Sequence, residues 1–149
     1  QEVFSFEGAC PFFRRRALLE SAIKGEVYDE DFFWYTDDID LGWRMRLFGW
    51  KSVYAPSVIA YHDRQTTKRL SSGKLDFIQM RRRIPRLKRK LDMRNQYLML
   101  VKNDILWLFL RHLPFFLWRQ IQLLIYILLF EPFVFVSLPS FFRLLPRMI

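Results

Sequence analysis

The sequence predicts a mixed α/β fold, of the α+β kind, followed by basic and apolar helices. Three differences along the chain predict it. Residues 1–63 alternate short apolar runs with helical patterns and hold 7 Lys/Arg against 11 Asp/Glu. Residues 64–103 hold 13 against 2 with helical spacing, and residues 104–149 hold 4 against 2 among mostly Leu, Phe, Ile and Trp. We therefore expect an acidic folded part, a basic helical belt and an apolar, amphipathic tail associated with a membrane.

In the acidic part, short apolar runs next to turn residues predict four strands. They are Val3–Phe6 and Ala9–Phe13 on either side of Gly8, then Ser52–Tyr54 and Val58–Tyr61 on either side of Pro56.

Two helices are expected between these strands. The first covers Arg15–Ile23 and ends at Lys24-Gly25, in the usual order for a helix C-terminus. The second begins at Thr36 or Asp37, either of which can cap it, and ends at Gly49. Its apolar face is formed by Leu41, Met45 and Phe48.

The remaining chain is expected to be helical, with prolines as interruptions. A long basic helix over 74–103 should break at Pro85, and the apolar helix Asp104–Phe130 should break at Pro114. The belt fits a surface that contacts anionic lipid, and a nucleic-acid patch or a solvated helix face are the alternatives. For the tail we favour helices lying in the membrane plane over a span or ordinary core.

Composition limits the classes of protein. A chain of 149 residues with 52% hydrophobic and 26% charged residues is not disordered. A single cysteine, Cys10, excludes a disulfide framework and a cysteine zinc site, and we expect it in the core. The net charge of +9 predicts an anionic partner. The chain begins at Gln1 without a start Met, so we expect a fragment.

Six carboxylates lie within residues 29–40, interleaved with aromatics. Such aromatics could wall off a pocket in which a carboxylate gains base strength. Asp37, Asp38 and Asp40 fall at the start of the second expected helix, and Arg44 can pair with Asp40 at i,i+4. A purely structural acidic helix start with one salt bridge is the alternative interpretation of this pattern.

The surrounding motifs resemble a known enzyme family. The ordered blocks GACPFFRR, GEVYDEDFF, TDDIDLGWR and GWK occupy residues 8–15, 25–33, 36–44 and 49–51, and Tyr61-His62 follows. Together they resemble family 2 glycosyltransferases, and more narrowly the bacterial rhamnosyltransferase-like branch that builds cell-surface polysaccharide. The resemblance implies a GT-A fold, of which this chain would carry the acceptor-side half in residues 1–63. The nucleotide-binding half would be missing, so the isolated fragment should be inactive.

The resemblance also implies roles for residues. Asp38 takes the place of the catalytic base, and Asp37 stands where the family usually has a supporting Glu. His62 falls where some members have a metal-binding histidine, and a structural role for it is an equal alternative. Contacts to the acceptor or its pocket are implied for five further side chains, namely Arg14, Arg15, Asp40, Trp43 and Arg44.

From these roles we expect an inverting transferase that uses a nucleotide-sugar donor and a lipid-linked or polysaccharide acceptor. Divalent Mg or Mn would be needed, with its main ligands in the missing half, and the protein would lie at the cytoplasmic face of the cell membrane. No nucleic acid is expected as a partner. The alternative is a non-catalytic membrane-anchored module that binds anionic lipid or a protein.

Overall fold

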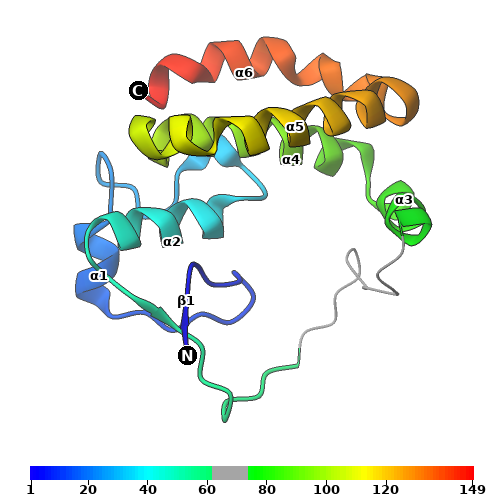
Figure 1. The fold of residues 1–149 in the computed structure, drawn as a ribbon. Coiled ribbons are helices and arrows are strands. Elements are labelled where there is room, and N and C mark those ends of the chain that lie inside the picture. Colours follow the sequence, from blue (N-terminus) through cyan, green and yellow to red (C-terminus); the bar gives the residue numbers. More distant parts are fainter. Residues whose placement is uncertain (62–73) are drawn as a thin grey trace. The chain divides into compact units, whose positions relative to one another are not determined.

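The computed structural model of the chain describes residues 1–61 and 74–149. They form two compact units, Gln1–Arg89 and Lys90–Ile149 (Figure 1). The boundary falls within the basic belt, so that segment contributes to both units. His62 lies outside the described residues.

The first unit contains short elements joined by long turns. They are β1 (Glu2–Val3), α1 (Arg15–Glu20), the 3-10 helix η1 (Glu30–Phe32), α2 (Asp37–Leu47), β2 (Ser52–Val53) and α3 (Lys74–Arg83). The two strands pair antiparallel, with Glu2 opposite Val53 and Val3 opposite Ser52. This pairing joins the chain segment before α1 to the segment after α2.

Two of the expected strands are absent from the described structure. Ala9–Phe13 forms turns and extended chain without strand partners, because Pro11 has no N–H to donate to a ladder. Val58–Tyr61 likewise pairs with no strand, and its large side chains are exposed, Tyr61 to 98%. Without a partner or a packed face, an apolar run of this length does not form a strand. The predicted strand Ser52–Tyr54 is confirmed in shorter form as β2, whereas β1 shares only Val3 with the predicted Val3–Phe6.

The first helix is shorter than expected. It ends at Glu20, and Ile23 and Glu26 then form an isolated antiparallel bridge. Lys24 and Gly25 connect them with φ of 54° and 85°. Both residues are therefore the centre of a tight two-residue turn, the geometry in which Gly is favoured, and they do not cap the helix.

Helix α1 packs on α2 through a small apolar core. Its buried members are Ala17, Leu41 and Met45, against which Phe6, Phe13, Leu18, Val27 and Trp50 pack. The predicted inward face of the second helix is confirmed for Leu41 and Met45, whereas Phe48 is exposed. Cys10 is also exposed, so its expected core position is wrong; it lies in a turn before α1.

The second unit is helical in all its described elements. It comprises most of α4 (Arg86–Asn103), then α5 (Leu106–Phe130), η2 (Pro132–Ser137), α6 (Leu138–Leu144) and η3 (Leu145–Arg147). The break expected at Pro85 is confirmed between α3 and α4. The break expected at Pro114 is wrong, because α5 continues through it. A proline removes one N–H, and the hydrogen bonds on both sides keep the helix continuous.

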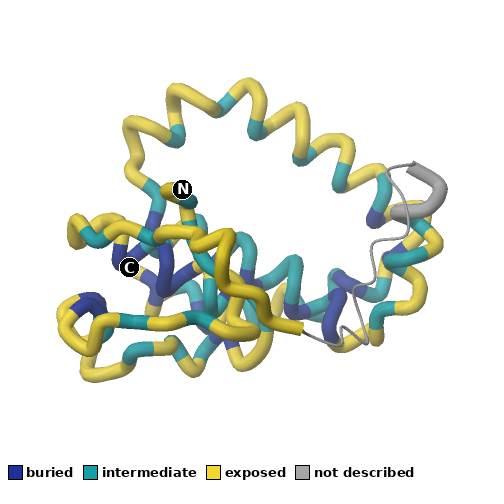
Figure 2. Tube along the Cα trace, turned by 90° about the horizontal axis from the view of Figure 1, so that it is seen from below, coloured by how far each residue is buried: buried dark blue, intermediate teal, exposed yellow. Residues whose placement is uncertain are grey.

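Helix α5 is the most exposed long apolar element of the unit. Its 25 residues extend over about 37 Å. Its most apolar window has a mean hydropathy of 1.6, and only 6% of that window is buried. Exposed residues predominate along much of the traced chain (Figure 2). Within residues 1–61 and 74–149, α5 is the one helix with the length and composition to cross a membrane.

Candidate active site

The motif acids lie at the start of α2, directly after a backbone segment of unusual conformation. Phe33, Tyr35 and Thr36 have φ of 58°, 74° and 67°. Bulky and β-branched residues rarely adopt positive φ, and each such residue costs on the order of 1–3 kcal/mol. The carbonyl of Thr36 accepts from Asp40 N at 2.7 Å, which starts the helix. The loop therefore turns sharply so that Asp37 and Asp38 form the first turn of α2.

Asp38 is held by two backbone amides. Gly8 N donates to Oδ2 at 3.0 Å and Ile39 N donates to Oδ1 at 2.8 Å. The side chain is half-buried, and each oxygen keeps a lone pair for a further donor. Asp38 is thus oriented but still accessible, which a carboxylate needs if it is to accept a proton from a bound hydroxyl.

A close contact brings residues 5–8 to this turn. A Cβ on Gly42 would lie 2.1 Å from Ser5 Oγ and 2.8 Å from Ser5 Cβ. Only glycine fits, and the contact allows Ser5 Oγ to donate to the Asp38 carbonyl at 3.2 Å. Gly42 therefore sets the position of the segment that carries the Gly8 amide.

Asp37 lies in a less polar environment. Burial raises its pKa, and the negative charges of Asp38 and Asp40 add to the rise, against backbone hydrogen bonds that lower it. Tyr28 is affected by the same acids: burial first, then the charges of Asp37 and Asp38, raise the pKa of its phenol. The raised pKa keeps the Tyr28 phenol protonated at neutral pH.

Asp40 and Arg44 form a buried ion pair. Arg44 Nε donates to Asp40 Oδ2 at 2.9 Å, and the two side chains are 0% and 2% exposed. The guanidinium also donates to the Ser21 carbonyl and, at 2.7 Å, to the Val27 carbonyl. The predicted i,i+4 pair is confirmed. Because both side chains are enclosed, they do not face solvent, and their predicted contact with an acceptor gains no support from this arrangement.

The other predicted contact residues lie at the surface or at its edge. Trp43 is partly buried and packs edge-on against Phe4, with ring centroids 5.5 Å apart. Arg14 and Arg15 are exposed immediately before and at the start of α1. Among residues 1–61 and 74–149, none of these three side chains forms a hydrogen bond or ion pair with Asp38, so their roles stay predictions.

The expected aromatic wall is wrong for most of its members. Phe32 is fully buried, but Phe33 is 77% and Trp34 is 45% exposed. Lys88 Nζ lies 5.3 Å from the Trp34 ring centroid and 3.9 Å from that of Tyr35, a cation–π arrangement.

A divalent metal is not accommodated by the described residues alone. Over 1–61 and 74–149, no three His, Cys, Asp or Glu side chains gather as a metal cluster. The literal Asp38-x-Asp40 pair does not change this, because Asp40 is committed to Arg44. The described part of the chain therefore does not by itself supply three such ligands to a metal ion.

Sequence reasoning missed three groups at this site: the Gly8 amide, the Ser5 hydroxyl and Tyr28. Gly8 and Tyr28 both stand inside the motif blocks, so the blocks pointed to their neighbourhood. Nothing in the local pattern shows that Gly8 and Asp38, thirty positions apart, share a hydrogen bond.

Comparison with known proteins shows that part of this chain is similar to a glycosyltransferase. No family model and no solved structure matches it. It is 40% identical over 65 residues to N-acetylglucosaminyl-diphospho-decaprenol L-rhamnosyltransferase of Mycobacterium tuberculosis, in strains CDC 1551 / Oshkosh and ATCC 25618 / H37Rv. The match covers 42% of this chain and 19% of the mycobacterial protein. Over that stretch the chain is similar to a sugar-transferring enzyme, in agreement with the resemblance of its motifs.

Proposed function

We propose that this chain carries the acceptor side of an inverting family 2 glycosyltransferase with a GT-A fold, and that Asp38 is its catalytic base. The observation that carries the proposal is the state of Asp38. Its two carboxylate oxygens accept from the amides of Gly8, thirty positions away, and Ile39, and it forms no ion pair among the described residues. The mycobacterial similarity supports the reaction class.

The chemistry assigned to Asp38 is proton transfer. As the acceptor hydroxyl attacks the anomeric carbon, its proton passes to an Asp38 carboxylate oxygen. The new bond joins the hydroxyl oxygen to the anomeric carbon, and the bond from that carbon to the nucleotide phosphate breaks. The departing nucleoside diphosphate keeps the electron pair. Attack from the face opposite the leaving group inverts the anomeric configuration.

The neighbouring acids are suited to supporting tasks. Burial favours the protonated form of Asp37, so Asp37 is less suited than Asp38 to carry a negative charge. Asp40 holds Arg44 and, through it, the carbonyls of Ser21 and Val27, which fixes α2 against the chain before it.

The partners in this proposal are a nucleotide-sugar donor and a lipid-linked glycan acceptor at the cytoplasmic membrane face. The lipid carrier is suggested by the similar mycobacterial enzyme, an N-acetylglucosaminyl-diphospho-decaprenol L-rhamnosyltransferase. Exposure of α5 supports peripheral or in-plane membrane contact. A required divalent Mg or Mn would depend on ligands outside the described residues, with His62 as a predicted ligand.

The decisive test compares two acids in the full-length enzyme that contains this chain. Asp38→Asn keeps the shape but removes the base, so transfer should fall by about 10²–10⁴ while donor binding survives. Asp37→Asn should reduce transfer far less. Sugar transfer to a polyprenyl-diphosphate acceptor is measured with labelled donor, and donor binding by calorimetry. Wild-type transfer by Asp38→Asn would overturn the proposal.

A second function, a non-catalytic membrane-anchored module, is favoured by the exposed apolar surface of α5. Lipid attachment should combine electrostatic attraction with burial of Trp and Phe side chains. The chain should bind vesicles of phosphatidylglycerol, and part of the binding should persist at about 1 M salt. Replacing Trp107 and Trp118 with Ser should remove the salt-resistant part, and replacing Arg81, Arg82 and Arg83 with Gln only the salt-sensitive part. Binding to DNA or RNA in place of vesicles would contradict both functions.

A further inference from the structure

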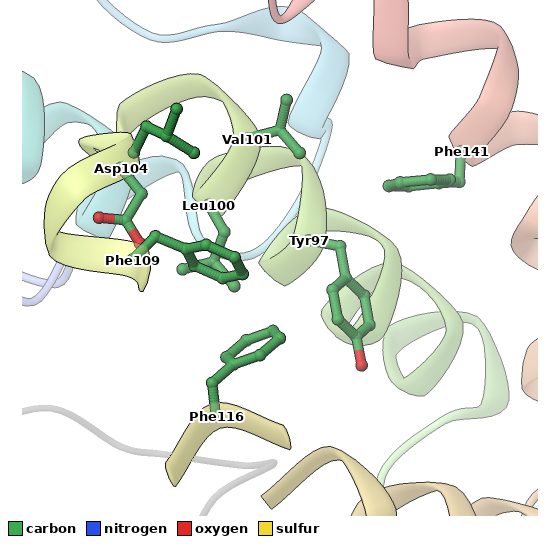
Figure 3. A pocket seen from close by; sticks show the side chains of 8 residues that line it. Tyr97, Leu100, Val101, Asp104, Phe109, Phe116 and Phe141 are labelled. Carbon is green, nitrogen blue, oxygen red and sulfur yellow. The ribbon is translucent and has the colours of Figure 1, made fainter. Parts of the chain in front are cut away.

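An open cavity of about 440 Å³ lies within the second unit, where α4, α5 and α6 meet. Its lining is almost entirely apolar and aromatic, and includes Leu100, Phe109, Phe116 and Phe141 (Figure 3). The volume falls within the range of small-molecule sites, roughly 300–1,000 Å³. A lining of this kind favours a hydrocarbon ligand.

The two ends of the cavity differ in charge. Tyr97 lies on α4, and Asp104 directly follows the last residue of that helix, seven positions later and about 10 Å along its axis. In Figure 3, Leu100, Phe109 and Phe116 lie between them. Asp104 makes one end acidic, and Tyr97 marks the other.

A cation, Arg119, lies near Tyr97, although it is not one of the residues that line the cavity. Tyr97 Oη donates to Gln120 Oε1, and the side-chain oxygen of the neighbouring Gln96 accepts from Arg119 Nη1 at 2.9 Å. Arg119 is close enough for its charge to oppose the rise in the Tyr97 pKa that burial causes. An anionic headgroup would therefore be attracted to the Tyr97–Arg119 end and repelled from the Asp104 end.

Helix α5 contributes side chains to the cavity and also has an exposed apolar surface. Phe109 and Phe116 line the cavity, while other apolar side chains of the same helix, including Trp107 and Phe115, are exposed. The charged residues within α5 are Arg111 and Arg119, both cations. An exposed apolar helix with only positive charge suits the boundary of an anionic membrane.

We propose that this cavity binds the diphosphate-proximal part of the isoprenoid chain of a lipid-linked acceptor, with the diphosphate at the Tyr97–Arg119 end. The inference rests on the proposed function, because a polyprenyl-diphosphate acceptor supplies both an apolar chain and an anionic headgroup. The chain fills the space between Phe109, Phe116 and Phe141, and the diphosphate pairs with Arg119.

Binding of farnesyl diphosphate to the full chain in neutral detergent tests the apolar part. Phe116→Ala should weaken binding about tenfold or more, because contacts with a buried aromatic ring are lost. The matched control is Phe115→Ala, the neighbouring side chain that is 77% exposed and does not line the cavity, which should bind as wild type. Phe116→Trp fills the space without removing apolar surface and should also weaken binding. Circular dichroism confirms that each variant folds. Equal effects of the two alanine variants would overturn the proposal.

Arg119→Gln tests the headgroup position. It should weaken farnesyl diphosphate about five- to tenfold and leave farnesol unchanged, whereas Arg111→Gln should change neither. Dilauroyl phosphatidylglycerol and inorganic diphosphate are the competitors. Failure of both to displace farnesyl diphosphate supports an isoprenoid site, and displacement by the phospholipid at equal concentration overturns it. Asp38→Asn should bind farnesyl diphosphate normally, so binding is scored independently of transfer and separates this inference from the proposed base.

Discussion

Asp38 and Asp40 lie two positions apart in the first turn of α2 but have opposite surroundings. Asp38 is half-buried and receives hydrogen bonds from the amides of Gly8 and Ile39. Asp40 is fully enclosed and paired with Arg44 at 2.9 Å. Residues two apart on a helix point in different directions, so one acid faces the core and the other the edge of the loop. The difference separates an acid available for chemistry from one that maintains the fold.

The largest expected effect comes from breaking the buried ion pair of Asp40. Asp40→Asn leaves the Arg44 guanidinium buried without its counter-charge and should lower the free energy of unfolding by about 3–5 kcal/mol. Asp38→Asn should change it by less than about 1 kcal/mol, because the half-exposed side chain retains an oxygen acceptor. Urea unfolding of the two variants provides the measurement. Similar destabilisation by both would show that Asp38 is structural as well.

A middle-sized effect is expected at the contact between Gly42 of α2 and Ser5, which positions the segment that carries the Gly8 amide. Gly42→Ala places a methyl group against Ser5 and should cost about 1–3 kcal/mol of unfolding free energy. Adding Ser5→Gly removes the obstructing Oγ and Cβ atoms and should restore part of the loss. The rescue is measured as the coupling free energy of a double-mutant cycle. Strictly additive effects would argue against the close contact.

The smallest expected effect concerns charge at the start of the helix. The folded-state pKa of Asp37 is raised above its ordinary value of 3.8, so folding favours the protonated acid. The stability that this acid contributes is therefore lost as the pH rises from the ordinary pKa to the raised pKa of the folded state. Asp37→Asn should therefore stabilise the protein at pH 7, by less than about 1 kcal/mol, and lose this advantage at pH 3. Unfolding at both pH values tests it, with exposed Glu30→Gln as control. A gain that is equal at both pH values would contradict the assigned sign.

Several features followed from local sequence patterns. The acidic start of α2, its inward Leu41 and Met45, and the pairing of Asp40 with Arg44 depend on helical spacing, which neighbouring residues define. The break at Pro85 follows from the loss of an N–H, a property of the residue itself. The motif blocks also indicated the reaction class to which the mycobacterial relative belongs.

Other features were decided by contacts between distant residues. The pairing of Glu2 with Val53, the Gly8 amide on Asp38 and the carbonyls of Ser21 and Val27 on Arg44 all join segments far apart in the chain. No local pattern states which distant backbone groups will meet. For the same reason Ala9–Phe13 read as a strand although no partner was placed beside it. The cavity between α4, α5 and α6 is likewise a product of packing, because helix composition alone does not define the space left between the side chains.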